Sequence, residues 1–318
     1  MTTTTVRSGV PVSARRHGRL SAARAAEWRD FYVCISPWLI GFLVLVAAPM
    51  LASIYLSFTK YDILQPPKFV GLDNYAEMLF EDALFGKSLF VTAYYTVFSV
   101  PLGVIGSLVL ALLLNQKMRT DSLFRTIYYL PSLTPAVASA VLWQWIFHHD
   151  IGLLNAALDA VGLPPVRWLL DEQWVIPAFV IVSLWQGVGG GRMIIFLAGL
   201  QGVPEHLYEA AKVDGANWWH RFTAVTIPMI SPTLLFNLIM GIIGSFQVFT
   251  LSFLMTAGAP NNASLFYVLY LYRNAFQYLK MGYASALAWF LFLVLATVTL
   301  LQFALSGRWV YYEGGTAR

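Results

Sequence analysis

The chain has 318 residues, of which 58% are hydrophobic and only 11% are charged, and its formal net charge is +4. A soluble domain carries about 25% charged residues, so this composition excludes an ordinary soluble protein and predicts an integral membrane protein. The basic excess does not indicate nucleic-acid binding, because it gathers on one side of the apolar segments, as a topology signal does. The single cysteine, Cys34, excludes an intrachain disulfide.

The N-terminal segment, residues 1–30, is rich in Thr, Ser and Arg, so we expect a disordered cytoplasmic tail. A charge-free window follows between Asp30 and Lys60. This window exceeds the roughly 7–15 apolar residues of a cleavable signal peptide, so it predicts an uncleaved first transmembrane helix.

Further apolar windows continue along the chain, and each is long enough for the roughly 20 residues that a helix needs to cross a bilayer. Their continuous apolarity favours helices over barrel strands, which alternate. The sequence therefore predicts an all-α, polytopic membrane protein with six transmembrane helices. The five further windows lie between Lys87 and Lys117, between Arg125 and Asp150, from Trp174 to about Gly202, from Phe222 to about Thr256, and from about Tyr283 to Leu305.

The basic residues predict the orientation of these helices. If the N-terminus is cytoplasmic, 13 of the 20 Lys and Arg residues lie inside, six lie outside, and Arg192 lies within the fourth window. The positive-inside rule then favours both termini in the cytoplasm. The predicted divisions are a transmembrane domain at 31–306, a cytoplasmic loop at 203–228 within it, and a cytoplasmic tail at 307–318.

The loop at 203–228 contains helix start and stop signals. Pro204 suits the first position of a helix, and Gly215 suits the left-handed residue that ends one. A second short helix is predicted from Asn217 to about Val225, ahead of Pro228. The loop is therefore expected to be a cytoplasmic helix-turn-helix between two crossings.

The residues of this loop closely resemble the EAA loop of ABC importer permeases. That pattern is Glu-Ala-Ala, three residues, Gly, nine residues, then Ile-x-Leu-Pro. Two aliphatic positions, Val225 and Ile227, depart from it conservatively. The matching residues are Glu209-Ala210-Ala211-Lys212-Val213-Asp214-Gly215, followed after nine residues by Val225-Thr226-Ile227-Pro228.

The resemblance implies that the loop inserts into a separate cytoplasmic ATPase and passes its movement to the membrane helices. Small side chains allow close approach to a groove, an acidic group can meet a basic partner, and glycine permits the tight turn. The alternative is an amphipathic helix that only links two crossings. The implied ATPase-coupling residues are Glu209, Ala210, Ala211, Asp214, Gly215 and Pro228.

Several further elements are similar to the carbohydrate-importing branch of the family, and to the maltose-permease type of subunit. Ala259 departs from this pattern, where the family more often has a second glycine. The elements are Gly71-Leu72-Asp73-Asn74-Tyr75, Leu130-Pro131-Ser132 with Trp143, Gly152-Leu153-Leu154-Asn155, Leu207-Tyr208, and the turn from Thr256 to Asn261 followed by Tyr272, Ala275 and Phe276.

This resemblance implies a type I ABC importer fold in the bacterial cytoplasmic membrane, which is the cell inner membrane. The implied cargo is a sugar or glycoside, with a sugar-phosphate ester left open. The implied partners are a second homologous permease, an ATPase dimer and an extracytoplasmic sugar-binding protein, with surrounding membrane lipid and no nucleic acid. ATP and Mg²⁺ would bind the partner ATPase, and this chain would bind no cofactor.

No catalytic or metal-binding residues are predicted, so the chain is not expected to be an enzyme. Gly86-Lys87-Ser88 resembles the end of a phosphate-binding loop, but Glu81 occupies the position that needs the first glycine. The adjacent residues His148-His149-Asp150 at a helix end favour a solvated cluster over convergence on one metal ion. A membrane-embedded enzyme would need a nucleophile, base or metal cluster at one depth, and none is visible.

Candidate substrate-pathway residues lie in the fourth and fifth windows. An ionisable residue within a span usually faces the interior, which favours Arg192 as a pathway residue, although a helix that ends near Gly189 would leave it snorkelling. The glycine run at 187–191 suits a flexible break or a close helix contact. The fifth window offers hydrogen-bonding or stacking groups for a sugar, or alternatively polar contacts between helices. These residues are Asn237, Ser245, Phe246 and Gln247.

An ion-coupled secondary transporter is the alternative function. Such transporters usually show an internal inverted repeat and acidic residues within the membrane. Neither a clear repeat nor an Asp or Glu in the predicted spans is present, so the sequence favours the ATP-driven importer.

Overall fold

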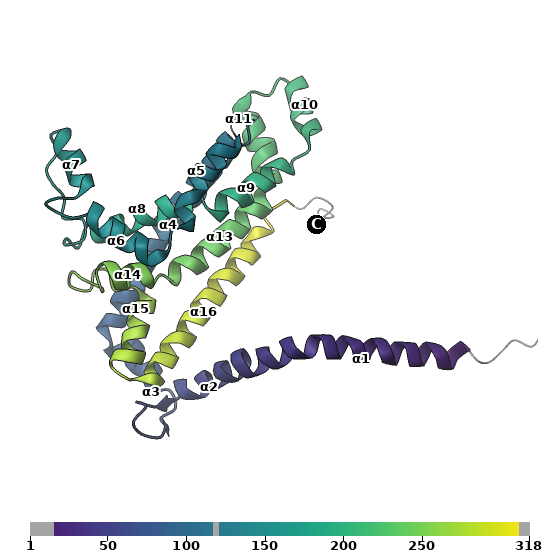
Figure 1. Cartoon of the computed structure of the whole chain (residues 1–318), viewed down its shortest axis with the longest axis vertical. Helices are drawn as coiled ribbons and strands as arrows, with labels where there is room; N and C mark the ends of the chain where they lie inside the picture. Colours follow the sequence, from purple (N-terminus) through teal and green to yellow (C-terminus); the bar gives the residue numbers. More distant parts are fainter. Residues whose placement is uncertain (1–15, 117–120, 312–318) are drawn as a thin grey trace, which may run out of the picture. The chain divides into compact units, whose positions relative to one another are not determined.

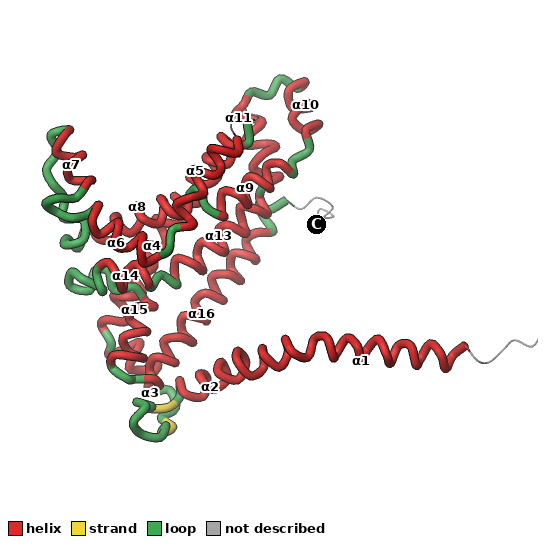
Figure 2. The backbone as a smooth tube through the Cα atoms, viewed as in Figure 1, coloured by secondary structure: helices red, strands yellow, loops and turns green. Residues whose placement is uncertain are grey.

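The computed structural model describes residues 16–116 and 121–311, and this part of the chain is mostly helical, with two short strands (Figures 1 and 2). It divides into two compact units, residues 1–55 and 56–318. Four helices among the described residues are long and apolar enough to cross a membrane, or five if one bent pair is counted as a span. The predicted helical membrane protein is therefore confirmed at this level.

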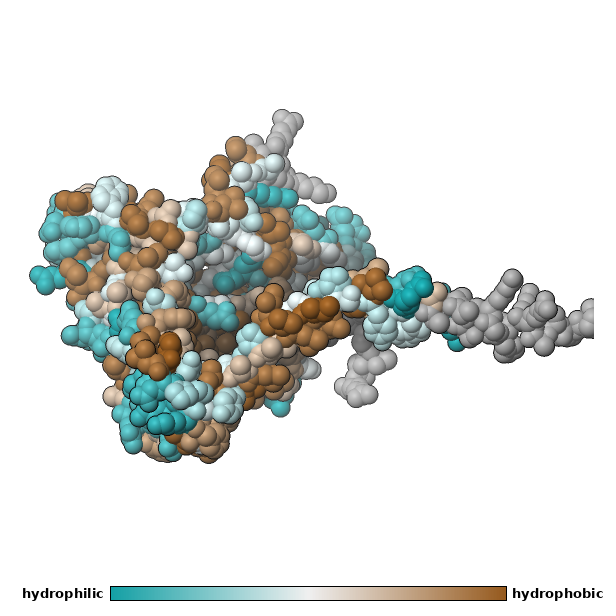
Figure 3. All heavy atoms as spheres, turned by 60° about the horizontal axis from the view of Figure 1, so that its bottom comes forward, coloured by the Kyte–Doolittle hydropathy of each residue, from teal (hydrophilic) through white to brown (hydrophobic). Residues whose placement is uncertain are grey.

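A long apolar helix makes up the described part of the first unit. It comprises α1 (Arg16–Phe42), the π-helical η1 (Leu43–Ala47) and most of α2 (Ala48–Ser57). Its side chains between Trp38 and Leu51 are largely exposed and mostly apolar, as a lipid-facing helix requires, and Figure 3 shows hydrophobic side chains along this long helix.

This helix begins at Arg16, earlier than expected. Residues 16–30 are helical, whereas the sequence predicted a disordered tail there. The stretch from Leu20 to Glu27 consists mostly of Ala, Arg and Leu, which are strong helix formers. Residues 1–15 of the predicted tail lie outside the described residues.

The second unit begins with a small polar cap and continues into its central helix. Strands β1 (Thr59–Lys60) and β2 (Lys68–Phe69) pair antiparallel, with Thr59 opposite Phe69. After α3 (Asp73–Ala76) and η2 (Glu77–Glu81), the carboxylate of Asp82 accepts hydrogen bonds from the N–H groups of Leu84 and Phe85. This N-cap starts α4 (Ala83–Leu114). α4 packs against α8 (Val175–Gly187), α9 (Gly191–Gln201), α13 (Ser231–Phe246) and α15 (Tyr267–Tyr272).

The third predicted window is broken into two helices. α5 (Asp121–Leu133) and α6 (Ala136–Ile146) are separated at Pro135, because a proline disfavours helical backbone at the residue before it. The loop after α6 carries α7 (Leu153–Ala160). Asn155 holds this loop with four hydrogen bonds, to the backbone of His149 and Val166 and to the indole of Trp168.

The fourth window is also broken. α8 (Val175–Gly187) and α9 (Gly191–Gln201) meet at a 50° bend. Gly189 lies so close to α5 that a Cβ there would be 2.0 Å from the carbonyl oxygen of Tyr128. The glycine run therefore provides both a helix break and a close helix contact, as the sequence predicted.

The remaining elements are a helical hairpin and two further long apolar segments. α13 and α14 together, from Ser231 to Met255, and α16 (Met281–Ser306) are each long and apolar enough to cross a membrane. Residues 312–318 of the predicted C-terminal tail lie outside the described residues. The elements are α10 (Glu205–Val213), α11 (Trp218–Arg221), η3 (Phe222–Thr226), α12 (Ile227–Met229), α13 (Ser231–Phe246), α14 (Thr250–Met255), α15 (Tyr267–Tyr272), η4 (Arg273–Gln277) and α16 (Met281–Ser306).

Candidate functional site

The helical hairpin of α10 and α11 is the candidate coupling site. Pro204 is the N-cap of α10, one position earlier than predicted, and none of the residues of α10 is buried. Gly215 ends the turn with a φ of +79°. The N–H of Ala216 donates to the carbonyl of Ala211 at 2.9 Å, and the N–H of Gly215 donates to that of Lys212 at 3.0 Å. These bonds form a Schellman motif, which confirms the predicted left-handed glycine.

The second arm of the hairpin is capped and tied to the first. The side-chain oxygen of Asn217 accepts from the N–H of His220 at 2.9 Å, which starts α11. Across the hairpin, the hydroxyls of Tyr208 and Thr226 are 3.0 Å apart. The two arms are therefore held at a defined angle rather than joined by a loose linker.

The outer surface of this hairpin is exposed and partly apolar. Val213 is 88% exposed and Trp218 is 64% exposed. Trp218 stacks on Phe222 with a centroid distance of 5.7 Å. Exposed apolar side chains grouped in this way mark an interaction surface. Figure 1 shows α10 and α11 at one end of the second unit and α3 at the other.

Five of the six predicted coupling residues lie on α10 and the turn that follows it. Glu209, Ala210, Asp214 and Gly215 are exposed and Ala211 is partly exposed, so these residues lie at the surface of the hairpin. Pro228 lies within α12, partly buried, where the hairpin joins the membrane helices.

Arg192 points into the helix bundle. A Cβ placed at Gly103 of α4 would lie 2.4 Å from Nη1 of Arg192, and one at Gly241 of α13 would lie 3.6 Å from Nη2. The guanidinium therefore lies close to Gly103 and Gly241, which belong to different helices, near the break between α8 and α9. This geometry favours the interior placement over a snorkelling side chain. The sequence did not single out Gly103 or Gly241.

The other predicted pathway residues lie on α13 and at its end. Asn237 is buried and donates to the carbonyl of Thr233 at 2.9 Å. The hydroxyl of Ser245 is 2.9 Å from that of Thr96 on α4. Phe246 belongs to a buried apolar cluster with α15 and α16, whereas Gln247 is exposed. The structure therefore places Ser245 in a contact between helices, and it does not bring all of these residues to one cavity.

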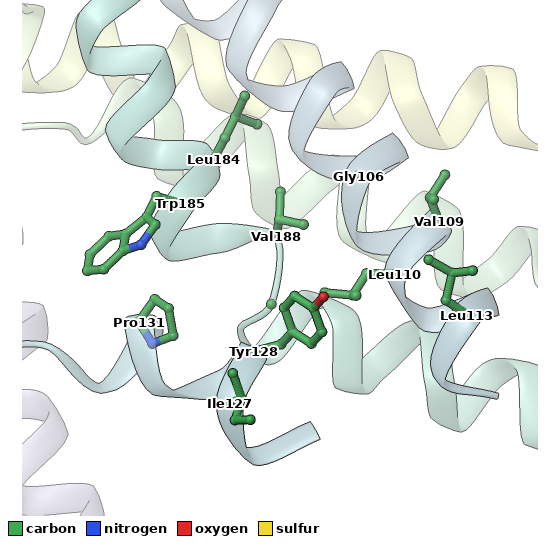
Figure 4. A pocket seen from close by; sticks show the side chains of 11 residues that line it. Gly106, Val109, Leu110, Leu113, Ile127, Tyr128, Pro131, Leu184, Trp185 and Val188 are labelled. Atoms are coloured by element: carbon green, nitrogen blue, oxygen red, sulfur yellow. The ribbon is translucent and has the colours of Figure 1, made fainter. Parts of the chain in front are cut away.

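An apolar pocket of about 460 Å³ lies beside the glycine break (Figure 4). Side chains from α4, α5 and α8 line it, including Val109, Tyr128 and Trp185. It presents few polar groups, so it does not suit a hydroxyl-rich ligand. Gly106 faces Val188 there, which lets α4 approach the end of α8.

No metal site is apparent in the described part of the chain, where no three His, Cys, Asp or Glu residues are grouped suitably. His148, His149 and Asp150 instead line a pocket of about 270 Å³ together with Arg167 and Trp168.

The fold and the hairpin define a membrane component of a transport system. Residues 89–311 match the model of the family described as binding-protein-dependent transport system inner membrane component, and the chain belongs to this family. This match confirms the resemblance that the EAA loop indicated.

Similar proteins cover nearly the whole chain. The probable ABC transporter permease protein YesP of Bacillus subtilis is 41% identical, over 89% of this chain and 92% of its own length. The arabinooligosaccharides transport system permease protein AraP of the same organism is 32% identical, over 90% and 94%. A crystal structure of a bacterial ABC transporter that imports alginate matches with a TM-score of 0.79 and 26% identity, over 91% and 99%.

Proposed function

We propose that this chain is the transmembrane permease subunit of an ATP-driven ABC importer that translocates a sugar or glycoside delivered by an external binding protein. The observation that carries the proposal is the α10–α11 hairpin, with its Schellman turn at Gly215 and its exposed face, in a member of this family. Relatives named for arabinooligosaccharide and lactose transport support the saccharide class.

ATP hydrolysis is assigned to a separate subunit. The family consists of membrane components, and this chain lacks a complete phosphate-binding loop. ATP and Mg²⁺ would bind the ATPase, whereas this chain would bind no cofactor. The proposed assembly contains this chain, a second homologous permease, an ATPase dimer and a sugar-binding protein. A solved alginate transporter in complex with a periplasmic protein supports the external partner.

The proposed topology has six crossings of the bacterial cytoplasmic membrane, with both termini in the cytoplasm. The broken pair α5 and α6 would form the third crossing and α8 with α9 the fourth. Contacts between loops support this arrangement. Lys280 pairs with Glu77 at 3.4 Å, and Asn261 donates to Glu172 at 2.6 Å, so the three predicted external loops meet one another. The membrane domain would span 31–306, with cytoplasmic tails at 1–30 and 307–318.

The coupling step follows from chain connectivity. Closure of the ATPase dimer would move the α10–α11 hairpin, in which Glu209, Ala210, Ala211, Asp214 and Gly215 present the contact face. α9 joins this hairpin through the short segment at 202–204, so movement of the hairpin pulls on α9. The glycine break at the other end of α9 lets α9 change its angle to α8, and because both helices pack against α4, such a movement also shifts the contact between α9 and α4.

The same movement would reach the substrate pathway. Arg192 lies at the start of α9 and contacts Gly241 of α13, so displacement of α9 changes the surface that these helices present. We assign Arg192, Asn237 and Ser245 to the boundary of the pathway, where turning of α9 would uncover their polar groups. Phe246 and Gln247 would mark the end of α13 nearest the external side.

Affinity purification of the tagged chain in mild detergent tests the function. We expect an ATPase and a second permease to co-purify, and a complex in proteoliposomes with its binding protein to show ATP-dependent sugar uptake. Glu209→Lys should remove the ATPase or uncouple it, because it reverses the charge on the exposed face of α10. A chain that purifies alone and moves solute in vesicles without ATP would establish the ion-coupled alternative instead.

A further inference from the structure

A second pocket, of about 370 Å³, lies at the N-terminal part of α4. One side comes from Lys87, Phe90 and Tyr94 of α4, and the other from Glu172 and Gln173 at the entry to α8. Its volume falls within the range of about 300–1,000 Å³ that is usual for small-molecule sites. In the proposed topology this is the extracytoplasmic end of α4.

The wall of the pocket on α4 is aromatic. Phe90 and Tyr94 are one helical turn apart, and their rings stack with centroids 6.2 Å apart and an interplanar angle of 27°. Phe90 is 70% exposed and Tyr94 is 40% exposed, so other residues of this chain leave both rings uncovered. The buried side chains of Val91 and Ile176 form the base beneath them.

The rim of the pocket is polar and already ordered. The ammonium group of Lys87 donates to the carbonyl of Asn261, and the amide of Asn261 donates to the carboxylate of Glu172 at 2.6 Å. One positive and one negative group are therefore held near each other by a shared residue. Gln173 adds an amide with both donor and acceptor capacity on the same side.

We propose that this pocket is an entry subsite that holds one ring of an incoming saccharide. A pyranose presents an apolar C–H face, which fits flat against an aromatic ring, and a rim of hydroxyls, which both donate and accept hydrogen bonds. The exposed rings of Phe90 and Tyr94 match the first property, and the mixed rim of Lys87, Glu172 and Gln173 matches the second. Because the rim carries both charges, it favours a neutral sugar over an anion. The inference rests on the proposed function for its direction of entry.

A cysteine-protection experiment tests the subsite in the purified importer complex. Cys34→Ser removes the native thiol, and Gln173→Cys places a single thiol on the rim of the pocket. The rate of labelling by a membrane-impermeant maleimide is then measured with rising concentrations of maltose, lactose or arabinotriose, with glycerol as the osmotic control. We expect at least one sugar to slow the labelling.

The aromatic wall is tested by leucine substitutions that keep apolar bulk but remove the flat ring. Phe90→Leu and Tyr94→Leu should each raise the sugar concentration that gives half protection by about two- to tenfold, as loss of ring stacking does. Phe236→Leu is the matched control, because Phe236 is 48% exposed on α13 and does not line the pocket. This control should leave protection unchanged.

Several results would overturn the subsite. These are no protection by any of the three sugars, equal protection in the leucine variants, or protection by phosphatidylglycerol vesicles alone, which would identify a lipid headgroup site. ATP-dependent uptake measured in the same preparation separates this outcome from failure of the proposed function. Uptake without protection refutes only the subsite, whereas protection without ATP-dependent uptake refutes only the importer assignment.

Discussion

Replacing Gly215 by glutamate should abolish transport and leave membrane insertion intact. Gly215 adopts a φ of +79°, and a side chain in this region costs about 1–2 kcal/mol. A Cβ at this position would meet no atom within 4 Å, so the substitution creates no clash and the membrane helices remain packed. The cost therefore acts on the turn between α10 and α11 alone.

The size of the effect follows from that cost. A penalty of about 1–2 kcal/mol lowers the population of the native turn by about 5–30-fold relative to altered turns. The new carboxylate also lies next to Asp214 at the C-terminal end of α10, where negative charge is unfavourable. Gly215→Asn should be milder than Gly215→Glu, because asparagine tolerates left-handed backbone and adds no charge.

Gly162 provides a matched control for the backbone strain. It has a φ of +77°, it ends α7 in the same kind of turn, and a Cβ there would also meet nothing within 4 Å. Sugar-stimulated ATPase activity and uptake are compared in proteoliposomes at equal expression. Gly162→Glu should retain coupling while Gly215→Glu loses it. Normal uptake by Gly215→Glu, or an equal loss in both variants, would refute the coupling assignment.

Two further substitutions test how the helices and loops are held. Gly189→Ala should lower the stability of the purified chain, measured by thermal unfolding, by about 1–3 kcal/mol, because the new methyl group would collide with the carbonyl of Tyr128. Gly187→Ala is the control and should have little effect, because a methyl group there would meet no neighbour. Asn155→Ala should lower the free energy of unfolding by about 1–3 kcal/mol, because it leaves the hydrogen-bond partners of Asn155 unpaired. It should also speed proteolysis within 148–170, and an unchanged rate of cleavage would show that Asn155 does not hold this loop.

Local signals explain why the coupling hairpin could be predicted in detail. Its helix ends depend on residues adjacent in sequence, so Pro204, Gly215 and Asn217 were sufficient to place both short helices. The apolar windows were equally informative, because a span of about 20 residues is a property of continuous sequence.

Breaks within the windows and contacts between them were harder to predict. A hydropathy window does not reveal that Pro135 divides α5 from α6, since prolines such as Pro101 also lie within unbroken helices. The placement of Arg192 depends on Gly103 and Gly241, which are about 90 and 50 residues away from it in sequence. Pairings at such separations are fixed only by the tertiary packing of the helices.

The close approach of the Arg192 side chain to Gly103 affects which substitutions this helix bundle can accept. The guanidinium occupies the volume that a methyl group at position 103 would take, so alanine there would push the arginine side chain aside. A shorter side chain at 192 would remove the conflict, and a methyl group at 241 would make only ordinary contact with the guanidinium. Positions 103 and 192 are therefore coupled. Gly103→Ala should displace the guanidinium when Arg192 is present and have no such effect beside a small residue, so single substitutions would understate the sequences that this bundle can accept.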